Sequence, residues 1–593
     1  MEDFTKFKDP LFIKTFNVKS LNVLSVQIRD YLVKNILLYG GHLSSNLGVV
    51  DLSIALYYSF DHSKDIFLFD TGHQCYTSKI LSGRNDFENF RTIKGLSGFP
   101  SPKEDPSDQF ITGHAGSILA AQNGYLIDDK NNNLKREVIS VIGDASIING
   151  MAFEGLNILS GRKDLKGIII LNDNNMGISK TVSGFSFLLM KLRGSAEYRF
   201  IKRLIPGFIR NIFKHLAIKN NLFEDLGFAY IGPFDGHNLK DLIKAFNLAK
   251  KYKKSVVIHV LTKKGYGYQN ASTDPEKYHG ISKTTLSKEY ITFSDGIARI
   301  ITMLNTNENP IYVVSSGMSY SSGFKNYSIN NKNYFIDTGI AEELSATLAS
   351  VLATKKRVFL SYYSVFSQRA YDQILNDIAL NNSHLVIGLD RAGLVPGDGK
   401  THQGIFDIGM FSALPNVIIT SPYDLNEAYN IISSAFNFKK ITVVRYPKDV
   451  TLNENVSLDN NFSFNWSIFQ DSDNPSIVII SYGKSLDMIK EVVTSNNINA
   501  LIINARIIWP LDKRMLYYLH EIKKKVIVYE EQYCNVNLYT LICEYLIKEK
   551  LYLDLIALNI KDYDIPSATK DEMLEYLHLD KKSLLEVIKN NLN

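Results

Sequence analysis

Cysteine is scarce in this sequence. Only 3 of the 593 residues are cysteine, and Cys75 lies far along the chain from Cys534 and Cys543. A disulfide framework needs more cysteines, and a zinc site needs cysteines at closer spacing. We therefore expect neither of these, and the expected compartment is the reducing cytoplasm.

Long apolar runs and an excess of one charge are also missing. The opening residues, MEDFTKFKDP, lack the apolar core of a secretion signal, and no later run is long enough to cross a bilayer. Lysine and arginine number 66 against 61 aspartates and glutamates, which gives a net charge of +5 with both signs mixed along the chain. Nucleic-acid binders usually concentrate their basic residues on one surface. We expect no nucleic-acid partner and no stable membrane attachment.

Short apolar segments alternate with helical segments through most of the chain. Residues 21–38 have apolar side chains at helical spacing. The short apolar segments that follow read as strands that are apolar on both faces, which are typical of parallel α/β sheets. The pattern restarts twice, so we predict three successive α/β domains with mainly parallel sheets, at residues 1–287, 288–455 and 470–593, with a polar linker in 451–476. The predicted strands lie in residues 138–143, 167–172, 256–261, 310–317, 357–364, 385–390, 416–422, 476–483, 499–506 and 525–531.

Oxygen-bearing side chains follow two of these strands. Asp144 comes after the strand in 138–143, and Asn174 comes after the strand in 167–172. About thirty residues separate them, which is the length of one β-α-β crossover, so both belong at the same edge of a sheet. Carboxylate and amide oxygens suit Mg²⁺. The alternative is that both residues form simple turns, with Asp144 capping the next helix.

The pair resembles the signature of thiamine diphosphate enzymes, in which Gly-Asp is followed by Asn-Asp-Asn. This resemblance implies that Asp144, Asn174 and the carbonyl of Met176 hold Mg²⁺, and that the metal anchors the diphosphate of the cofactor. The usual third residue of the first motif is glycine, and this chain has Ala145 there. A second departure is Gly116, which stands where the family usually has serine. The resemblance also assigns four residues to the cofactor site: His73, His114, Gly143 and Ala145.

Glu342 opens an apolar helix in the segment FIDTGIAEELSATLAS, residues 335–350. Taken alone, Glu342 is explained by the helix dipole, which favours a carboxylate at this end. The segment is similar to one in transketolase-type enzymes whose glutamate hydrogen-bonds the aminopyrimidine of the cofactor. The two residues after that glutamate are Gln and His in the transketolase-type enzymes, and they are Glu343 and Leu344 in this chain. The resemblance makes Glu342 the activating acid and Phe366 the aromatic partner of the pyrimidine.

Several longer stretches resemble the 1-deoxy-D-xylulose-5-phosphate synthase family, among them GHQCYTSKILSGR (72–84), LDRAGLVPGDGKTHQG (389–404) and VRYPK (444–448). The resemblance covers nearly the whole chain. It implies a transketolase-like thiamine diphosphate-binding fold, a homodimer, and the decarboxylative condensation of pyruvate with D-glyceraldehyde 3-phosphate. That reaction supplies isoprenoid, thiamine and pyridoxal synthesis. The alternatives are a transketolase-type enzyme with another acceptor and a catalytically impaired cofactor-binding homologue.

The same resemblance selects the residues around the substrates. Arginine is suited to phosphate and carboxylate because its guanidinium donates in a planar fork. By resemblance Arg391, Arg445 and Tyr363 hold the acceptor phosphate, and Arg369 lies near the carboxylate of pyruvate. The expected catalytic residues besides Glu342 are His42, His73, His402 and Asp398, with His279 as a weaker candidate and no role for His237.

One basic amphipathic segment departs from this pattern. Residues 198–219, YRFIKRLIPGFIRNIFKHLAIK, are interrupted by Pro206 and Gly207. Such a segment can bind a membrane surface. Its position after the metal loop resembles that of a family region that covers the active site, and this resemblance favours a lid instead.

Overall fold

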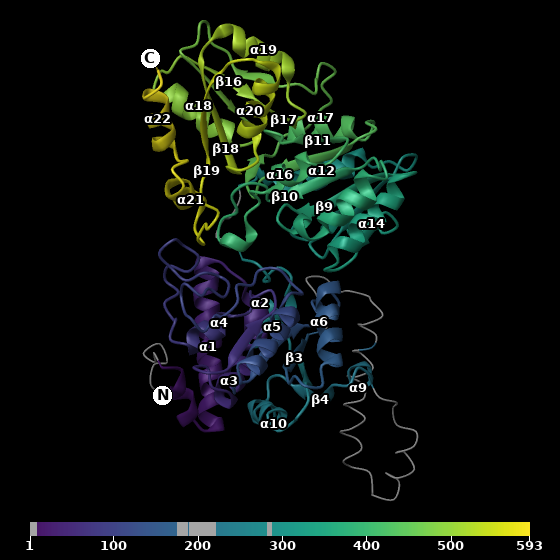
Figure 1. Ribbon diagram of the computed structural model, residues 1–593, viewed down its shortest axis with the longest axis vertical. Coiled ribbons are helices and arrows are strands. Elements are labelled where there is room, and N and C mark those ends of the chain that lie inside the picture. Colours follow the sequence, from purple (N-terminus) through teal and green to yellow (C-terminus); the bar gives the residue numbers. More distant parts are fainter. Residues whose placement is uncertain (1–8, 175–187, 189–220, 282–286, 593) are drawn as a thin grey trace, which may run out of the picture. The chain divides into compact units, whose positions relative to one another are not determined.

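The computed structural model describes residues 9–174, 188, 221–281 and 287–592 (Figure 1). They form two compact units, Met1–Lys283 and Thr284–Asn593. Met176 and the basic segment 198–219 lie outside the described residues. Among the helices that are described, none is long and apolar enough to cross a membrane.

The first unit contains a five-stranded parallel sheet in the order β1-β2-β3-β5-β4. Four of its strands, β1, β2, β3 and β5, are apolar runs that are buried almost throughout, as expected when helices cover both faces of a sheet, while the edge strand β4 is partly exposed. The strands are β1 (Ile66–Phe69), β2 (Val138–Gly143), β3 (Ile168–Asp173), β4 (Ala229–Asp235) and β5 (Val256–Leu261).

Helices pack on both faces of this sheet. The core on one face contains α1 (Val18–Tyr39), α3 (Val50–Ser59) and α10 (Leu239–Ala249), and the core on the other contains α5 (Ile118–Asn131) and α6 (Gly150–Gly161). The amide of Asn17 caps α1 by accepting the N–H of Ser20, and that of Asn149 caps α6 by accepting the N–H of Met151. Shorter helices complete the unit: α2 (Leu43–Gly48), α4 (Tyr76–Leu81), α9 (Leu222–Asp225) and α11 (Gln269–Thr273).

The second unit begins with a seven-stranded sheet in the order β17-β11-β12-β10-β9-β7-β8, in which only the β11–β17 pair is antiparallel. Helix α14 (Glu342–Ala353) packs on one face, and α12 (Phe293–Leu304) with α17 (Leu425–Ala435) packs on the other. The strands are β7 (Ile311–Ser315), β8 (Phe335–Asp337), β9 (Arg357–Tyr363), β10 (Val386–Asp390), β11 (Val417–Thr420), β12 (Ile441–Tyr446) and β17 (Ile507–Trp509).

The C-terminal part of the same unit carries a third sheet, in the order β14-β16-β15-β18-β19. Only the β14–β16 pair is antiparallel. The strands are β14 (Ser467–Gln470), β15 (Ile477–Ser481), β16 (Ala500–Asn504), β18 (Lys525–Tyr533) and β19 (Asp554–Ile560), and the helices are α18 (Ser485–Ser495), α19 (Lys513–Ile522), α20 (Leu538–Glu549), α21 (Lys570–Tyr576) and α22 (Lys581–Lys589).

The predicted class, α/β with mainly parallel sheets, is confirmed, and every predicted strand coincides with a strand of the structure. The linker expected in 451–476 is not wholly irregular, because it contains β14 and the end of β13 (Val450–Leu452), which pairs with β6 (Tyr290–Thr292). β14 is a short edge strand of the C-terminal sheet, and β13 forms a separate two-stranded sheet with β6, so the structure of each depends on a partner strand.

Candidate active site

Three histidines from separate segments meet in the first unit. The ring centroids of His42, His73 and His279 lie 5.3 to 5.5 Å from one another. The hydroxyl of Tyr76 lies 3.2 Å from Nδ1 of His42, and Ser45 Oγ lies 3.3 Å from Nδ1 of His279. The predicted histidines His42 and His73 therefore belong to one cluster, and the weaker candidate His279 joins them.

Burial favours the neutral form of two of these histidines, His73 and His279. It lowers the pKa of His73 to about 3 and that of His279 well below its usual range, and the nearby positive charge of Lys264 adds to both effects. Nδ1 of His73 is buried and makes no hydrogen bond to any described residue. A neutral imidazole with an open ring nitrogen is suited to hydrogen-bonding a ligand.

Lys264 is a site residue that the sequence did not reveal. Burial lowers its pKa to about 8, while the carboxylates of Asp144 and Glu276 raise it. The neighbouring Gly265 donates its N–H to the carbonyl of Ser44, at 2.8 Å, and this bond ties the lysine loop to the helix after His42. In the sequence this residue is one of two adjacent lysines, a pattern more typical of solvated charge.

Asp144 and Asn174 lie at the same edge of the first sheet. Each follows the end of its own strand, β2 or β3, and these strands are parallel neighbours. The backbone N–H of Asp144 donates to the carbonyl of Asn172 at 3.2 Å, which joins the two loops directly. Thr262 after β5 donates its hydroxyl to Oδ1 of Asn172 at 2.6 Å. The sheet thus brings both expected oxygen ligands to one place.

The two departures from the cofactor motif are accommodated differently. Ala145 follows Gly143 and Asp144 without a positive φ, so its methyl group causes no backbone strain. Gly116 has a φ of 93° and donates its N–H to Oδ1 of Asp70 at 2.9 Å. A Cβ at this glycine would overlap the side chain of Asn149, so this chain needs glycine there. His114 lies nearby in sequence and is half-buried.

Glu342 lies at the first turn of α14 with only 4% of its surface exposed. Burial raises the pKa of its carboxyl to about 7, against the opposing effect of Arg369, whose Nη1 lies 3.7 Å from Oε2. Within the described residues that oxygen makes no hydrogen bond. Of the two neighbours, Leu344 is 56% exposed and Glu343 is half-buried.

An aromatic group follows β9. The ring of Phe366 stacks on that of Tyr363 with centroids 5.3 Å apart, and the ring of His402 lies 5.8 Å from Phe366. The guanidinium of Arg391 lies 3.9 Å above the Tyr363 ring. Four predicted site residues are therefore in one chain of contacts, and a fifth and sixth, Glu342 and Arg369, pair with each other, with Arg369 in the same segment as Phe366.

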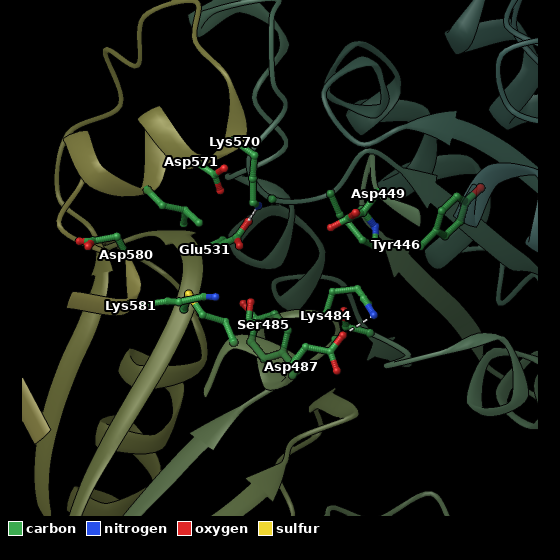
Figure 2. Close-up of a pocket in the computed structure, with 18 of the residues that line it drawn as sticks. Tyr446, Asp449, Lys484, Ser485, Asp487, Glu531, Lys570, Asp571, Asp580 and Lys581 are labelled. Atoms are coloured by element: carbon green, nitrogen blue, oxygen red, sulfur yellow. Dashed lines mark hydrogen bonds and ion pairs between the residues drawn. The ribbon is translucent and has the colours of Figure 1, made fainter. Parts of the chain in front are cut away.

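Two further predicted residues, Asp398 and Arg445, form ion pairs. Oδ2 of Asp398, which is buried, lies 3.3 Å from Nζ of Lys448. Arg445 is also buried and donates to both carboxylate oxygens of Asp407, at 2.7 and 3.0 Å. Arg445 lines a cavity of about 640 Å³ between the two sheets of the second unit (Figure 2), where Lys570 pairs with Glu531.

Comparison with known families agrees with this architecture. Residues 4–262 match the family model described as 1-deoxy-D-xylulose-5-phosphate synthase. Residues 289–452 match the transketolase pyrimidine-binding domain, and residues 468–584 match the transketolase C-terminal domain. The molecule is thus a transketolase-like enzyme.

Relatives that match almost the full length identify the family more closely. A 1-deoxy-D-xylulose-5-phosphate synthase of Clostridium tetani is 35% identical over 614 residues, covering 98% of each chain. One of Listeria welshimeri is 37% identical over 568 residues, covering 89% of this chain and 88% of the relative. The chain belongs to the 1-deoxy-D-xylulose-5-phosphate synthase family, whose members are transferases that depend on thiamine diphosphate.

Proposed function

We propose that this enzyme condenses pyruvate with D-glyceraldehyde 3-phosphate, with loss of CO₂, to give 1-deoxy-D-xylulose 5-phosphate. The observation that carries the proposal is the buried carboxyl of Glu342, which has an open oxygen and a pKa raised to about 7 by burial. A carboxylic acid that holds its proton near neutral pH is what protonation of a cofactor ring nitrogen requires.

The described residues fit thiamine diphosphate and Mg²⁺ at two places. The open oxygen of Glu342 and the ring of Phe366 suit the aminopyrimidine, and the oxygens of Asp144 and Asn174 suit Mg²⁺ beside a diphosphate. When bound, thiamine diphosphate supplies the electron sink for decarboxylation, which no side chain offers. The remaining tasks are orientation, charge complementarity and proton transfer by side chains.

Each remaining side chain has a proposed task. Arg391, Arg445 and Tyr363 bind the acceptor phosphate, and Arg369 binds the carboxylate of pyruvate. His42, His73 and His402 hydrogen-bond the substrate oxygens, His42 and His402 also exchange protons there, and Asp398 acts beside His402. In this assignment the neutral state of His73, whose pKa is lowered to about 3 by burial, makes it a hydrogen-bonding group rather than an acid at neutral pH.

A coupled assay tests the proposal. The purified enzyme is incubated with pyruvate and D-glyceraldehyde 3-phosphate, with and without thiamine diphosphate and Mg²⁺, and both CO₂ release and the pentulose phosphate are measured. We expect product only with all four components. Activity on transketolase donors without CO₂ release would contradict the proposal. We also propose that the enzyme works in the cytoplasm as a homodimer, which light scattering of the purified protein tests.

A further inference from the structure

A buried polar cluster joins the two α/β parts of the second unit. It consists of Ser364 after β9, Asp407 at the first turn of α16 (Asp407–Ser412), Arg445 on β12 and Gln532 on β18. All four residues are almost completely buried, with exposed fractions of 1%, 2%, 2% and 0%. A polar group removed from water this completely is retained only when its hydrogen bonds are satisfied.

Asp407 is the centre of this cluster. Its Oδ2 accepts hydrogen bonds from Nε of Arg445 at 2.7 Å and from the hydroxyl of Ser364 at 3.0 Å. Its Oδ1 accepts from Nη2 of Arg445 at 3.0 Å and from Nε2 of Gln532 at 2.9 Å. One carboxylate therefore fixes the ends of two strands of the seven-stranded sheet to a strand of the C-terminal sheet.

Gln532 completes the arrangement because its amide bonds to both members of the ion pair. Its Nε2–H donates to Asp407 while its Oε1 accepts from Nη2 of Arg445 at 3.1 Å. The amide NH₂ donates to the aspartate and the amide oxygen accepts from the arginine, so a glutamine can bond to both members of the pair. A hydrocarbon side chain of similar size would make neither hydrogen bond. With Nε and Nη2 of Arg445 held in this way, no described residue bonds to its Nη1.

The cluster also acts on a second residue of the proposed acceptor site. Ser364 directly follows Tyr363, and its backbone N–H donates to the carbonyl of Asp390 at 2.7 Å. With its hydroxyl on Asp407 and its N–H on Asp390, Ser364 fixes the turn after β9. The ring of Tyr363 under the Arg391 guanidinium depends on that turn.

We propose that Gln532 of the C-terminal domain is a positioning residue for the acceptor: through Asp407 it orients Arg445 and the turn that directly follows Tyr363. This inference rests on the proposed function, in which both residues hold the acceptor phosphate. It gives the C-terminal domain, in which the sequence offered no chemical motif, a part in the choice of acceptor.

The test is the selectivity for a phosphorylated acceptor, which is the ratio of kcat/KM for D-glyceraldehyde 3-phosphate to that for D-glyceraldehyde, with pyruvate saturating. In Gln532→Leu we expect this ratio to fall about tenfold, the effect of weakening one hydrogen bond to a charged group. The fall should come from a higher KM for the phosphorylated acceptor, while the KM for pyruvate stays unchanged. Gln532→Glu, which keeps the volume but removes the donor to Asp407, should also lower the ratio.

Asn504 supplies the matched control. It is a buried amide on β16 of the C-terminal sheet, and its Nδ2 donates at 3.0 Å to the carboxylate of Glu427, on α17 of the neighbouring part. Asn504→Leu should lower the melting temperature about as much as Gln532→Leu and leave the acceptor ratio unchanged. The proposal would be overturned if Gln532→Leu and Gln532→Glu lost as much stability as Asn504→Leu and kept the acceptor ratio of the wild type.

A reference variant tests the proposed phosphate site separately from the role of Gln532. Arg391→Ala removes a proposed phosphate ligand outside the cluster, so it should lower the same ratio by about tenfold or more. If Arg391→Ala has no effect on the ratio, the phosphate site itself is wrong, and the proposal for Gln532 fails with it. If Arg391→Ala lowers the ratio and both Gln532 variants do not, only the role of Gln532 is refuted.

Discussion

Replacing Glu342 by glutamine should raise the stability of the cofactor-free protein at neutral and alkaline pH while removing its activity. The carboxyl is 4% exposed and its pKa is raised by burial to about 7, from an ordinary value of 4.5. Below pH 4.5 the group is neutral in the folded and unfolded states, and it does not affect stability. Between pH 4.5 and 7 the unfolded chain ionises first, so the free energy of unfolding decreases as the pH rises.

The size of this effect follows from the two pKa values. Each pH unit between 4.5 and about 7 is equivalent to about 1.4 kcal/mol, so the ionised Glu342 destabilises the fold by about 3 kcal/mol above pH 7. Glu342→Gln lacks this ionisation and avoids the loss. The attraction between Arg369 and the carboxylate 3.7 Å away acts only on the ionised form of Glu342, and it is already contained in the raised pKa of that group.

Thermal unfolding of the full chain from pH 4.5 to 8.5, without thiamine diphosphate, measures the effect. The melting temperature of Glu342→Gln relative to the wild type should rise by several degrees across pH 4.5 to 7 and then stay level. Glu343→Gln is the control, since it removes the same charge from the same helix terminus at a less buried position. A difference between Glu342→Gln and wild type that does not vary with pH would refute the reasoning.

Other substitutions test the rest of the site. Product formation by Glu342→Gln should fall at least about 100-fold in the same preparation, because the cofactor loses its acid. Asp144→Asn should raise the Mg²⁺ concentration needed for half-maximal activity about tenfold or more, and an unchanged Mg²⁺ titration would contradict the metal site. Ala145→Gly should change thiamine diphosphate affinity less than about threefold by calorimetry, since Ala145 has no positive φ. Gly116→Ser should unfold at least about 1 kcal/mol more easily in urea, because its Cβ would overlap Asn149, and equal stability would contradict this.

The sequence predicted the strands and the residues at their ends well. Runs of apolar β-branched residues need little context to form buried parallel strands, so the ends of β2, β3 and β10 fell where expected. Asp144 and Asn174 follow such ends, and parallel topology alone brings neighbouring ends to one edge of the sheet. The edge strand β14, whose structure depends on its partner strand, was missed, and so was β1, which is apolar and buried but only four residues long.

Only the tertiary structure decided which polar side chains are buried together. Lys264 and Gln532 have ordinary sequence surroundings, but the amine of Lys264 is desolvated near Asp144, and Gln532 bonds to an ion pair contributed by distant segments. Local sequence determines periodicity and turns, whereas the pKa of a lysine or the partner of a glutamine depends on contacts between residues far apart in the chain. The sequence therefore determined the sheets and the places where chemistry can occur, and the packing of helices and sheets determined which charges are desolvated there and which side chains hold them.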